Sequence, residues 1–258
     1  MKKTLFLFVL AVMFFTSCNT ELKLAKQFVE QNQNIPVAVL FPEAADVKIE
    51  YNTQYEKKTD VLDGFSQDLF LDVVYNSYAE GLRDFGLDVY IPDDLDNILI
   101  DSTHWYVLLS QMEIVGRITE YEDYLFSDRD DYSFKYPLNT VNVASWFEVN
   151  NGQWLPVLYN ESNLIDKFAS KTDYHFWSSD FDYNYTIDTL KLDDVYNFGV
   201  YLGKLYASYT YNSLMNKYVE LEMWKKYNYF PTEYVKFDPY LKEYRYATYD
   251  DRFKEVIQ

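Results

Sequence analysis

Apolar residues recur at intervals of three and four positions in residues 65–85, which predicts an amphipathic helix with one buried face. The positions that carry this pattern are Phe65, Leu69, Phe70, Val73, Val74, Ser77, Tyr78, Leu82 and Phe85. Ser66 is suited to cap the start of the helix, and Gly86 stands just past its end. We expect the apolar face of this helix to lie against a sheet.

A second helical pattern covers residues 192–221 and begins with two aspartates. Its apolar positions are Val195, Leu202, Leu205, Tyr206 and Tyr209. Gly199, Gly203 and Ala207 add a stripe of small side chains at every fourth position. Such a stripe lets a helix approach its neighbour closely, so we expect the second helix to pack tightly on the sheet or on the first helix.

Short apolar runs on either side of the first helix predict two buried strands. Residues 36–42 form a run bounded by prolines, and residues 87–92 form another directly after the helix. Because a short strand, helix, strand unit brings its strands into one sheet, we expect these two runs to pair.

Three further segments predict longer strands. Residues 103–119 are apolar on both faces at first and one-sided later. Residues 141–149 and 154–159 predict a hairpin, since Asn150-Asn151-Gly152 joins them and Asn and Gly tolerate the positive φ of a tight turn. The whole order predicts a single α+β domain over residues 35–223, with a mixed, largely antiparallel sheet and two long helices packed against it.

The start of the chain has the composition of a secretory signal that ends at a cysteine. Lys2 and Lys3 precede an unbroken apolar run from Leu5 to Phe15, and small residues lead from it to Cys18. The run is too short for a membrane-spanning helix. This pattern resembles the lipobox of bacterial lipoproteins, although Phe15 stands where that family usually has Leu, Val or Ile.

The resemblance implies that residues 1–17 are a signal peptide and that Cys18 is the first mature residue, acylated on its thiol and amine. Acylation would also account for the single cysteine of an exported protein. Residues 18–34 are polar with scattered apolar positions, and we interpret them as a lipidated tether with some helical tendency. We expect a location in a Gram-negative cell envelope, anchored in the outer membrane and facing either the periplasm or the surface.

The chain is strongly acidic, with 23 basic and 41 acidic side chains and a formal net charge of −18. Nucleic acid and anionic headgroups repel such a protein, so we expect no nucleic-acid partner and a membrane contact made by the lipid. The charge is uneven. Residues 224–258 hold seven basic and six acidic side chains, whereas residues 18–223 hold 14 basic and 35 acidic side chains.

Residues 224–258 are also rich in aromatic side chains, which make up 20% of the whole chain. Because burying apolar area is favourable, we expect these residues to form an extension that packs on the domain. Pro231 and Pro239 predict short pieces rather than one helix. The alternative is a tail that stays mobile until a ligand binds its rings.

The sequence offers little catalytic chemistry. His104 and His175 have no second histidine at ligand spacing, and no glycine-rich phosphate loop occurs. Asp180-Phe-Asp182-Tyr-Asn184 lacks the later glycine and glutamate of a calcium loop. We expect no catalytic residue, metal or cofactor, although a pair of acids for glycoside hydrolysis stays open because sequence spacing does not report distance in space.

Aromatic side chains are the remaining candidates for binding, since a ring can stack on a sugar or anchor a partner protein. The candidates are Trp146, Trp154, Trp177, Trp224, Tyr234 and Tyr240. Core burial is the alternative for each of them. Asp101-Ser102-Thr103 and Asp188-Thr189-Leu190 resemble the O-glycan acceptor of some Gram-negative envelopes.

The order of elements, up to the helical stretch Leu202-Gly-Lys-Leu-Tyr-Ala-Ser-Tyr209, resembles periplasmic accessory lipoproteins. These include auxiliary lipoproteins of transport systems and activators of wall synthesis. The order is also similar to that of uncharacterised Gram-negative envelope lipoproteins, in which a second helix similar to this stretch follows the hairpin. The resemblance implies a non-enzymatic accessory component that binds another envelope protein. A cell-surface glycan-binding lipoprotein is the alternative, and a carboxylate-based glycoside hydrolase is the second alternative.

Overall fold

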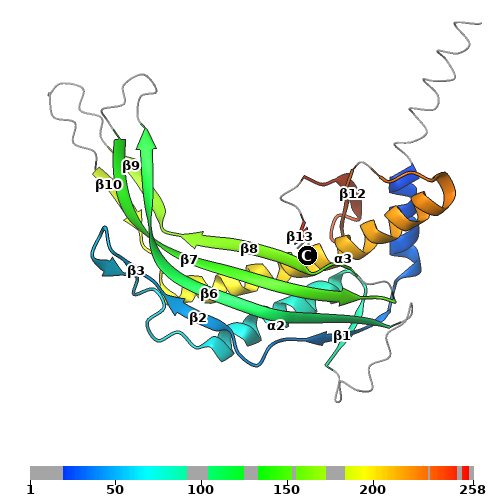
Figure 1. Ribbon diagram of the computed structural model, residues 1–258, viewed down its shortest axis with the longest axis horizontal. Coiled ribbons are helices and arrows are strands. Elements are labelled where there is room, and N and C mark those ends of the chain that lie inside the picture. The colour runs from blue at the N-terminus through cyan, green and yellow to red at the C-terminus, as the bar shows by residue number, and fades with distance from the viewer. Residues whose placement is uncertain are drawn as a thin grey trace, which may run out of the picture.

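The body of the molecule is a long, curved sheet with two helices on one face (Figure 1). The structure is a computed structural model that describes residues 20–91, 104–124, 133–152, 155–172, 184–231, 233–248 and 252–255. Seven strands form the main sheet in the order β13-β8-β7-β6-β1-β5, with β2 paired to β6. The long strands are antiparallel, and the short strands β1 and β2 run parallel to β6. The predicted α+β class is confirmed.

The elements have the following bounds. The first half of the chain forms β1 (Pro36–Leu40), β2 (Asp46–Ile49), β3 (Tyr51–Asn52), β4 (Lys57–Lys58), α2 (Gln67–Asp84), β5 (Asp88–Tyr90) and β6 (Trp105–Tyr124). The second half forms β7 (Ser133–Asn150), β8 (Leu158–Ile165), β9 (Lys167–Thr172), β10 (Asn184–Asp188), α3 (Leu192–Tyr227), β11 (Val235–Asp238), β12 (Glu243–Tyr246) and β13 (Lys254–Glu255).

Helix α2 lies between β1 and β5 in the sequence, and these two strands pair in parallel in the sheet. The apolar runs on either side of the helix predicted this pairing. The Ser66 hydroxyl caps the helix by accepting a hydrogen bond from the backbone N–H of Leu69 at 3.3 Å. Gly86 follows the helix with a φ of 85°, a conformation that glycine adopts without steric cost. The chain therefore turns at once into β5, which pairs with β1.

Strands β7 and β8 form the hairpin that Asn150-Asn151-Gly152 predicted. The Asn150 side chain accepts a hydrogen bond from the N–H of Gly152 at 2.8 Å, and Gly152 has a φ of 82°. The second strand of the hairpin differs from the prediction, because β8 begins at Leu158 and continues to Ile165. Pro156 lies just before this start, and a proline has no N–H to contribute to a strand ladder.

Helices α2 and α3 pack closely along small residues. A Cβ atom on Gly203 would lie 2.5 Å from the carbonyl oxygen of Val74. A Cβ atom on Gly81 would lie 2.7 Å from the Cβ of Ala207. Neither position has room for a side chain. The small-residue stripe of α3 therefore faces α2, which is one of the two packings that the sequence predicted.

Two buried tyrosines form hydrogen bonds that join α2 to α3 and α3 to the sheet. The Tyr78 hydroxyl donates to the Thr210 hydroxyl at 2.9 Å, and the hydroxyls of Tyr206 and Ser145 lie 3.0 Å apart. Burial raises the pKa of both tyrosines, so both hydroxyls stay protonated. Paired polar groups in a core favour one arrangement of the surrounding elements over others.

Residues 20–31 form an N-terminal helix that belongs to the core. Its buried apolar side chains are Leu24, Ala25, Phe28 and Val29. The Phe28 ring packs against Trp105 and Tyr211, with centroid distances of 5.9 and 5.6 Å. The expectation of a tether is therefore wrong for these residues. The polar positions between the apolar ones form the outer face of an amphipathic helix.

The described part of the C-terminal extension packs against α3, which itself includes Trp224. Asn216 of α3 donates to the Val235 carbonyl at 2.6 Å and accepts from the Val235 N–H at 2.8 Å. Asn212 accepts from the N–H of Phe237 at 2.8 Å. These side chains satisfy the backbone of β11 on one side, and β12 pairs with it on the other.

Candidate functional site

The four described aromatic candidates lie in different parts of the molecule. Trp146 is on β7, and Trp224 is near the end of α3. Tyr234 and Tyr240 belong to the C-terminal extension. The structure does not gather them into one site.

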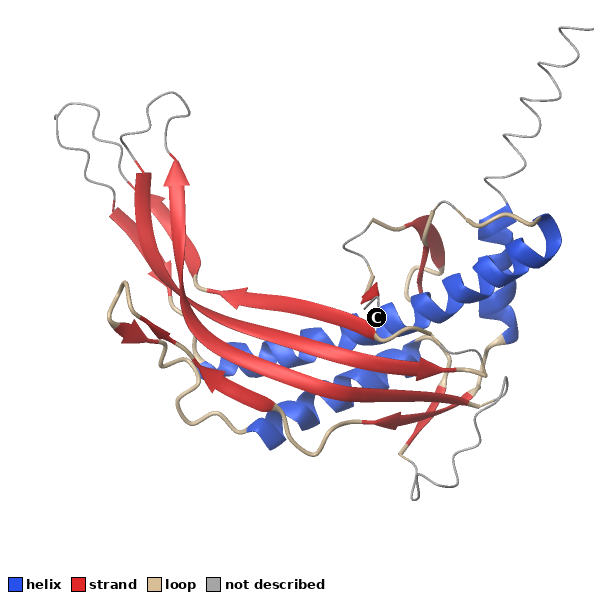
Figure 2. Cartoon of the chain, viewed as in Figure 1, coloured by secondary structure: helices blue, strands red, loops and turns tan. Residues whose placement is uncertain are grey.

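Helices α2 and α3 cover one face of the long sheet and leave its other face without a helix (Figure 2). Trp146 of β7 lies on this uncovered face. The neighbouring Ser145 contacts Tyr206 of α3, and successive side chains of a strand point to opposite faces. The strand register places Tyr159 of β8 beside Trp146, with ring centroids 5.1 Å apart and an interplanar angle of 49°. Both residues are half-buried, so each ring still presents surface to solvent.

Polar side chains next to the two rings hold one another in place. Asn142 donates to the Glu161 carboxylate at 2.8 Å and to the amide oxygen of Asn163 at 2.9 Å. The Tyr159 hydroxyl donates to the same carboxylate at 3.0 Å. We call Trp146, Tyr159, Asn142, Glu161 and Asn163 the sheet-face site. Because its polar groups are already paired, little ordering is needed when a ligand arrives.

The Tyr159 hydroxyl keeps its proton and acts as a hydrogen-bond donor. Partial burial, helped by the hydrogen bond to Glu161, raises the pKa of Tyr159 to about 12. The Glu161 carboxylate accepts this hydrogen bond and the one from Asn142, and it has further lone pairs for another donor. The sheet-face site therefore combines apolar rings with an acceptor of fixed orientation.

Charged residues of β2 and β6 continue this face on the other side of β7. Asp46 pairs with Glu113 in the strand register, and Lys48 bridges both carboxylates with Nζ to oxygen distances of 2.7 and 2.5 Å. Hydrogen bonds to Asp46 and then Glu113 raise the pKa of Lys48. Exposed pairs add little stability, so their main effect is to set the charge pattern of the face.

The register also aligns two carboxylates, since Glu113, Ala144 and Glu161 form one row across three strands. Strands lie about 4.8 Å apart, so the two backbones are about 10 Å apart. A hydrolase needs one acid that holds a proton for the leaving group. Glu113 accepts a hydrogen bond from Lys48 and Glu161 accepts one from Asn142, so both carboxylates already have donors within the protein.

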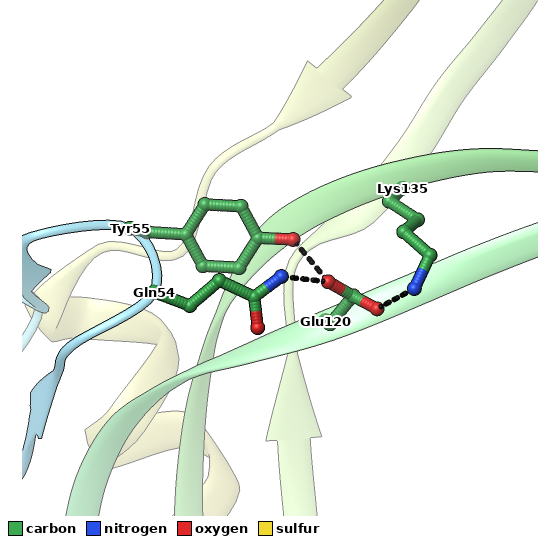
Figure 3. Close-up of polar contacts among 4 residues, drawn as sticks. All are labelled: Gln54, Tyr55, Glu120 and Lys135. Carbon is green, nitrogen blue, oxygen red and sulfur yellow. Dashed lines mark hydrogen bonds and ion pairs between the residues drawn. The ribbon is translucent and has the colours of Figure 1, made fainter.

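A second polar cluster lies where the long strands leave the core (Figure 3). The Glu120 carboxylate accepts hydrogen bonds from Lys135 at 2.7 Å and from Tyr55 and Gln54 at 2.6 Å each. The bond from Lys135 and then the bond from Tyr55 lower the pKa of Glu120 to about 2. These contacts join the turn between β3 and β4 to strands β6 and β7, so we interpret the cluster as structural.

Tyr234 lines a groove of about 520 Å³ between α3, the start of β8 and the extension. The hydroxyls of Tyr234 and Ser213 lie 3.1 Å apart, and the Arg252 guanidinium carbon lies 5.1 Å from the centre of the Tyr234 ring. Glu220 and Glu233 also line the groove. A concave space with rings and a few polar groups is typical of small-ligand sites.

The last two aromatic candidates are exposed at the surface. Trp224 stacks on Phe230 with ring centroids 4.7 Å apart. Tyr240 donates a hydrogen bond to Asp84 at the end of α2. Neither belongs to the sheet-face site.

Several sequence candidates lie outside the described residues, namely Cys18, Trp154, Trp177, His175 and Asp101-Ser102-Thr103. His104 stands directly before β6, and Asp188 and Thr189 are exposed at the end of β10. In the described ranges, no three His, Cys, Asp or Glu side chains gather as metal ligands. None of the described helices combines the length and the hydropathy of a membrane span.

The sequence patterns did not single out the polar members of the sheet-face site. Glu161 and Asn163 were missed because the strand was expected to end at Tyr159. The sequence did contain a signal for them, because Tyr159, Glu161 and Asn163 occupy every second position and such residues lie on one face of a strand. Asn142 lies in a predicted strand, but only the register shows that it faces Glu161.

No family model matches this chain, and no curated protein matches it. Among solved structures, the chain is similar to a "putative neuraminyllactose-binding hemagglutinin homolog from Helicobacter pylori". The two chains are 12% identical with a TM-score of 0.40, and the match covers 74% of this chain and 90% of that chain.

Proposed function

We propose that this chain is a lipid-anchored, non-enzymatic component of the cell envelope that binds a partner protein on its sheet-face site. The observation that carries the proposal is the half-buried ring pair of Trp146 and Tyr159, next to hydrogen-bonded amide and carboxylate groups. Tryptophan and tyrosine dominate the binding energy of protein interfaces when polar residues surround them. A broad strand surface also suits a large partner better than a small ligand, which prefers a concave site.

The anchor in this proposal is Cys18, which follows an apolar signal and small residues. The acidic chain offers anionic headgroups little electrostatic attraction, so acyl chains would supply the membrane affinity. Two residues span at most about 7 Å, and the N-terminal helix begins by residue 20. A lipid on Cys18 therefore holds the folded body close to the membrane surface.

Site-specific photocrosslinking in the native envelope tests the binding surface. A photoreactive phenylalanine analogue placed at Trp146 should form a discrete adduct with a partner protein. The same analogue at Tyr201, an exposed tyrosine on α3, is the matched control and should form no such adduct. Introducing Glu161→Lys should remove the adduct at position 146 by inverting the charge beside it. Equal labelling from both positions, or an adduct that ignores Glu161→Lys, would show that the sheet face is not the binding surface.

Glycan binding is the second candidate function, and the groove around Tyr234 favours it. Phe230 and Tyr234 line this groove together with carboxylates and cations, which can exchange hydrogen bonds with sugar hydroxyls. An array of purified oligosaccharides tests the hypothesis of glycan binding. The full-length chain is applied to the array in a detergent without a sugar headgroup. A saccharide that binds wild type and Trp146→Ala equally, but binds Glu233→Gln more weakly, would support the groove. An array without any bound saccharide would reject it.

A further inference from the structure

The end of α3 and the loop after it expose an unusual amount of aromatic surface. Trp224 and Tyr227 are 46% and 58% exposed, and Tyr229 and Phe230 are 46% and 53% exposed. Trp224 and Phe230 stack on each other, so they form a joint ring surface rather than two separate rings. We call Trp224, Tyr227, Tyr229 and Phe230 the aromatic end. Exposed apolar groups that adjoin one another mark a contact surface.

The aromatic end lies next to the point where the described chain begins. The N-terminal helix packs along the last part of α3, where the rings of Phe28 and Tyr218 have centroids 5.5 Å apart. The start of that helix and the end of α3 lie at the same end of the molecule (Figure 1). Because residue 20 is two positions after Cys18, a lipid on Cys18 would enter the membrane beside the aromatic end.

The charge of this region fits a membrane surface better than the charge of the body does. Lys225 and Lys226 lie between Trp224 and Tyr227 of the aromatic end and form ion pairs with Glu222. Residues 224–258 are close to neutral, with seven basic and six acidic side chains, whereas the rest of the mature chain is strongly acidic. Anionic headgroups repel the body, so the near-neutral end is the part that can approach a bilayer.

We propose that the aromatic end inserts its rings into the headgroup layer of the membrane that holds the Cys18 lipid. This inference rests on the lipid anchor of the proposed function. Tyrosine and tryptophan favour the membrane interface because each has an apolar body and a polar tip, and lysine can keep its charge in water beside them. The contact would hold the long axis of α3 at a fixed orientation, with the other end of the molecule directed away from the bilayer.

Fluorescence of a single label on the membrane-bound chain tests the contact. Cys18 is the only cysteine and its thiol is occupied when acylated, so Tyr227→Cys introduces one free thiol. The full-length protein is purified from membranes, labelled with a polarity-sensitive fluorophore and reconstituted in vesicles of phosphatidylethanolamine and phosphatidylglycerol. Emission from position 227 should shift to the blue and be quenched by brominated lipids. Tyr229→Cys repeats the measurement at a second position.

Tyr201→Cys is the matched control, since Tyr201 is equally exposed on the same helix. At 1.5 Å per residue it lies about 39 Å along α3 from Tyr227, so its label should stay in water. Flotation of the vesicles separates two kinds of failure. Protein that floats while its labels at 227 and 229 behave like the label at 201 overturns the membrane contact alone. Protein that does not float overturns the anchor and the contact together.

Discussion

The hydroxyl of Tyr206 on α3 lies 3.0 Å from the hydroxyl of Ser145 on β7, and both residues are fully buried. Ser145 points toward the helices, and its neighbour Trp146 points the other way. The same strand therefore anchors the helix layer with one residue and presents the proposed binding surface with the next.

Tyr206→Phe removes one hydroxyl of this pair and leaves that of Ser145 buried without its partner. We expect the free energy of unfolding to fall by about 1–2 kcal/mol, the usual cost of an unsatisfied buried group. Urea unfolding followed by circular dichroism measures the loss. Tyr201→Phe removes an exposed hydroxyl from the same helix and should leave stability unchanged. Equal stabilities for the two variants would contradict the role given to the buried pair.

Gly203→Ala places a methyl group against the backbone of α2. The added Cβ would meet the Val74 carbonyl oxygen at 2.5 Å, so the helices must separate. We expect a loss of about 1–3 kcal/mol, the range for an overpacked core, despite the better helix propensity of alanine. Thermal unfolding checks this, with the exposed Val200→Ala as control. A Tm at or above that of wild type would mean that the helices do not touch at Gly203.

Glu120→Gln should lower Tm at neutral pH by weakening the cluster with Lys135 and Tyr55. The pKa of Glu120 is lowered from 4.5 to about 2 in the folded chain, chiefly by the Lys135 hydrogen bond. A lowered folded pKa means that the contribution is present above pH 4.5 and is lost as the pH falls toward 2. The Tm difference between wild type and variant should therefore shrink over that range. Glu50→Gln, at an exposed glutamate, should change Tm little at any pH.

Limited trypsin digestion reports how firmly β11 is docked. Lys236 lies inside β11, whose backbone is paired with Asn216 and Asn212, so wild type should resist cleavage there. Asn216→Ala removes two of these bonds and should speed cleavage after Lys236 several-fold, because local opening becomes easier. The exposed Asn197→Ala serves as control. Rapid cleavage of wild type at Lys236 would show that the extension is mobile.

Cys18→Ser tests the anchor directly. The variant should lose metabolic labelling with palmitate and move from the membrane fraction to the soluble fraction, because the acyl chains supply the membrane affinity. Immunoblots of separated fractions give the distribution, and wild type processed in parallel is the reference. A variant that stays membrane-bound and acyl-labelled would refute lipidation at Cys18.

The helices and the turns next to them were predictable because their signals are local. A 3.6-residue apolar period, a Ser66 cap and the glycines at positions 86 and 152 act within a few residues of themselves. Residues 20–31 were predicted to be a tether with only some helical tendency, because the contacts that stabilise this helix are not local in the sequence. Its Phe28 is stabilised by Trp105 and Tyr211, which are distant in sequence, and a short helix is marginal without such packing.

Strands β9 and β10 were missed, since each is stable only when paired with the other. The sequence of β9 has no clear apolar alternation, and the alternation in β10 covers only five residues. A similar limit applies to Asp166, a buried carboxylate that accepts hydrogen bonds from the backbone of Asn139 and Leu190 at 2.7 Å each. Asn139 lies on β7 and Leu190 lies between β10 and α3, and no spacing in the sequence reports that they meet at Asp166.

The sequence alone determined the fold class, the two long helices, the hairpin turn and the lipobox pattern, because each depends on neighbouring residues. Tertiary structure decided which face of the sheet stays uncovered and which side chains meet on it. Trp146 was a candidate from its residue type, but Tyr159, Asn142 and Glu161 join it only through the pairing of β7 with β8. A one-residue change of register would move those side chains to the other face, so a long-range pairing rather than any local pattern creates the site.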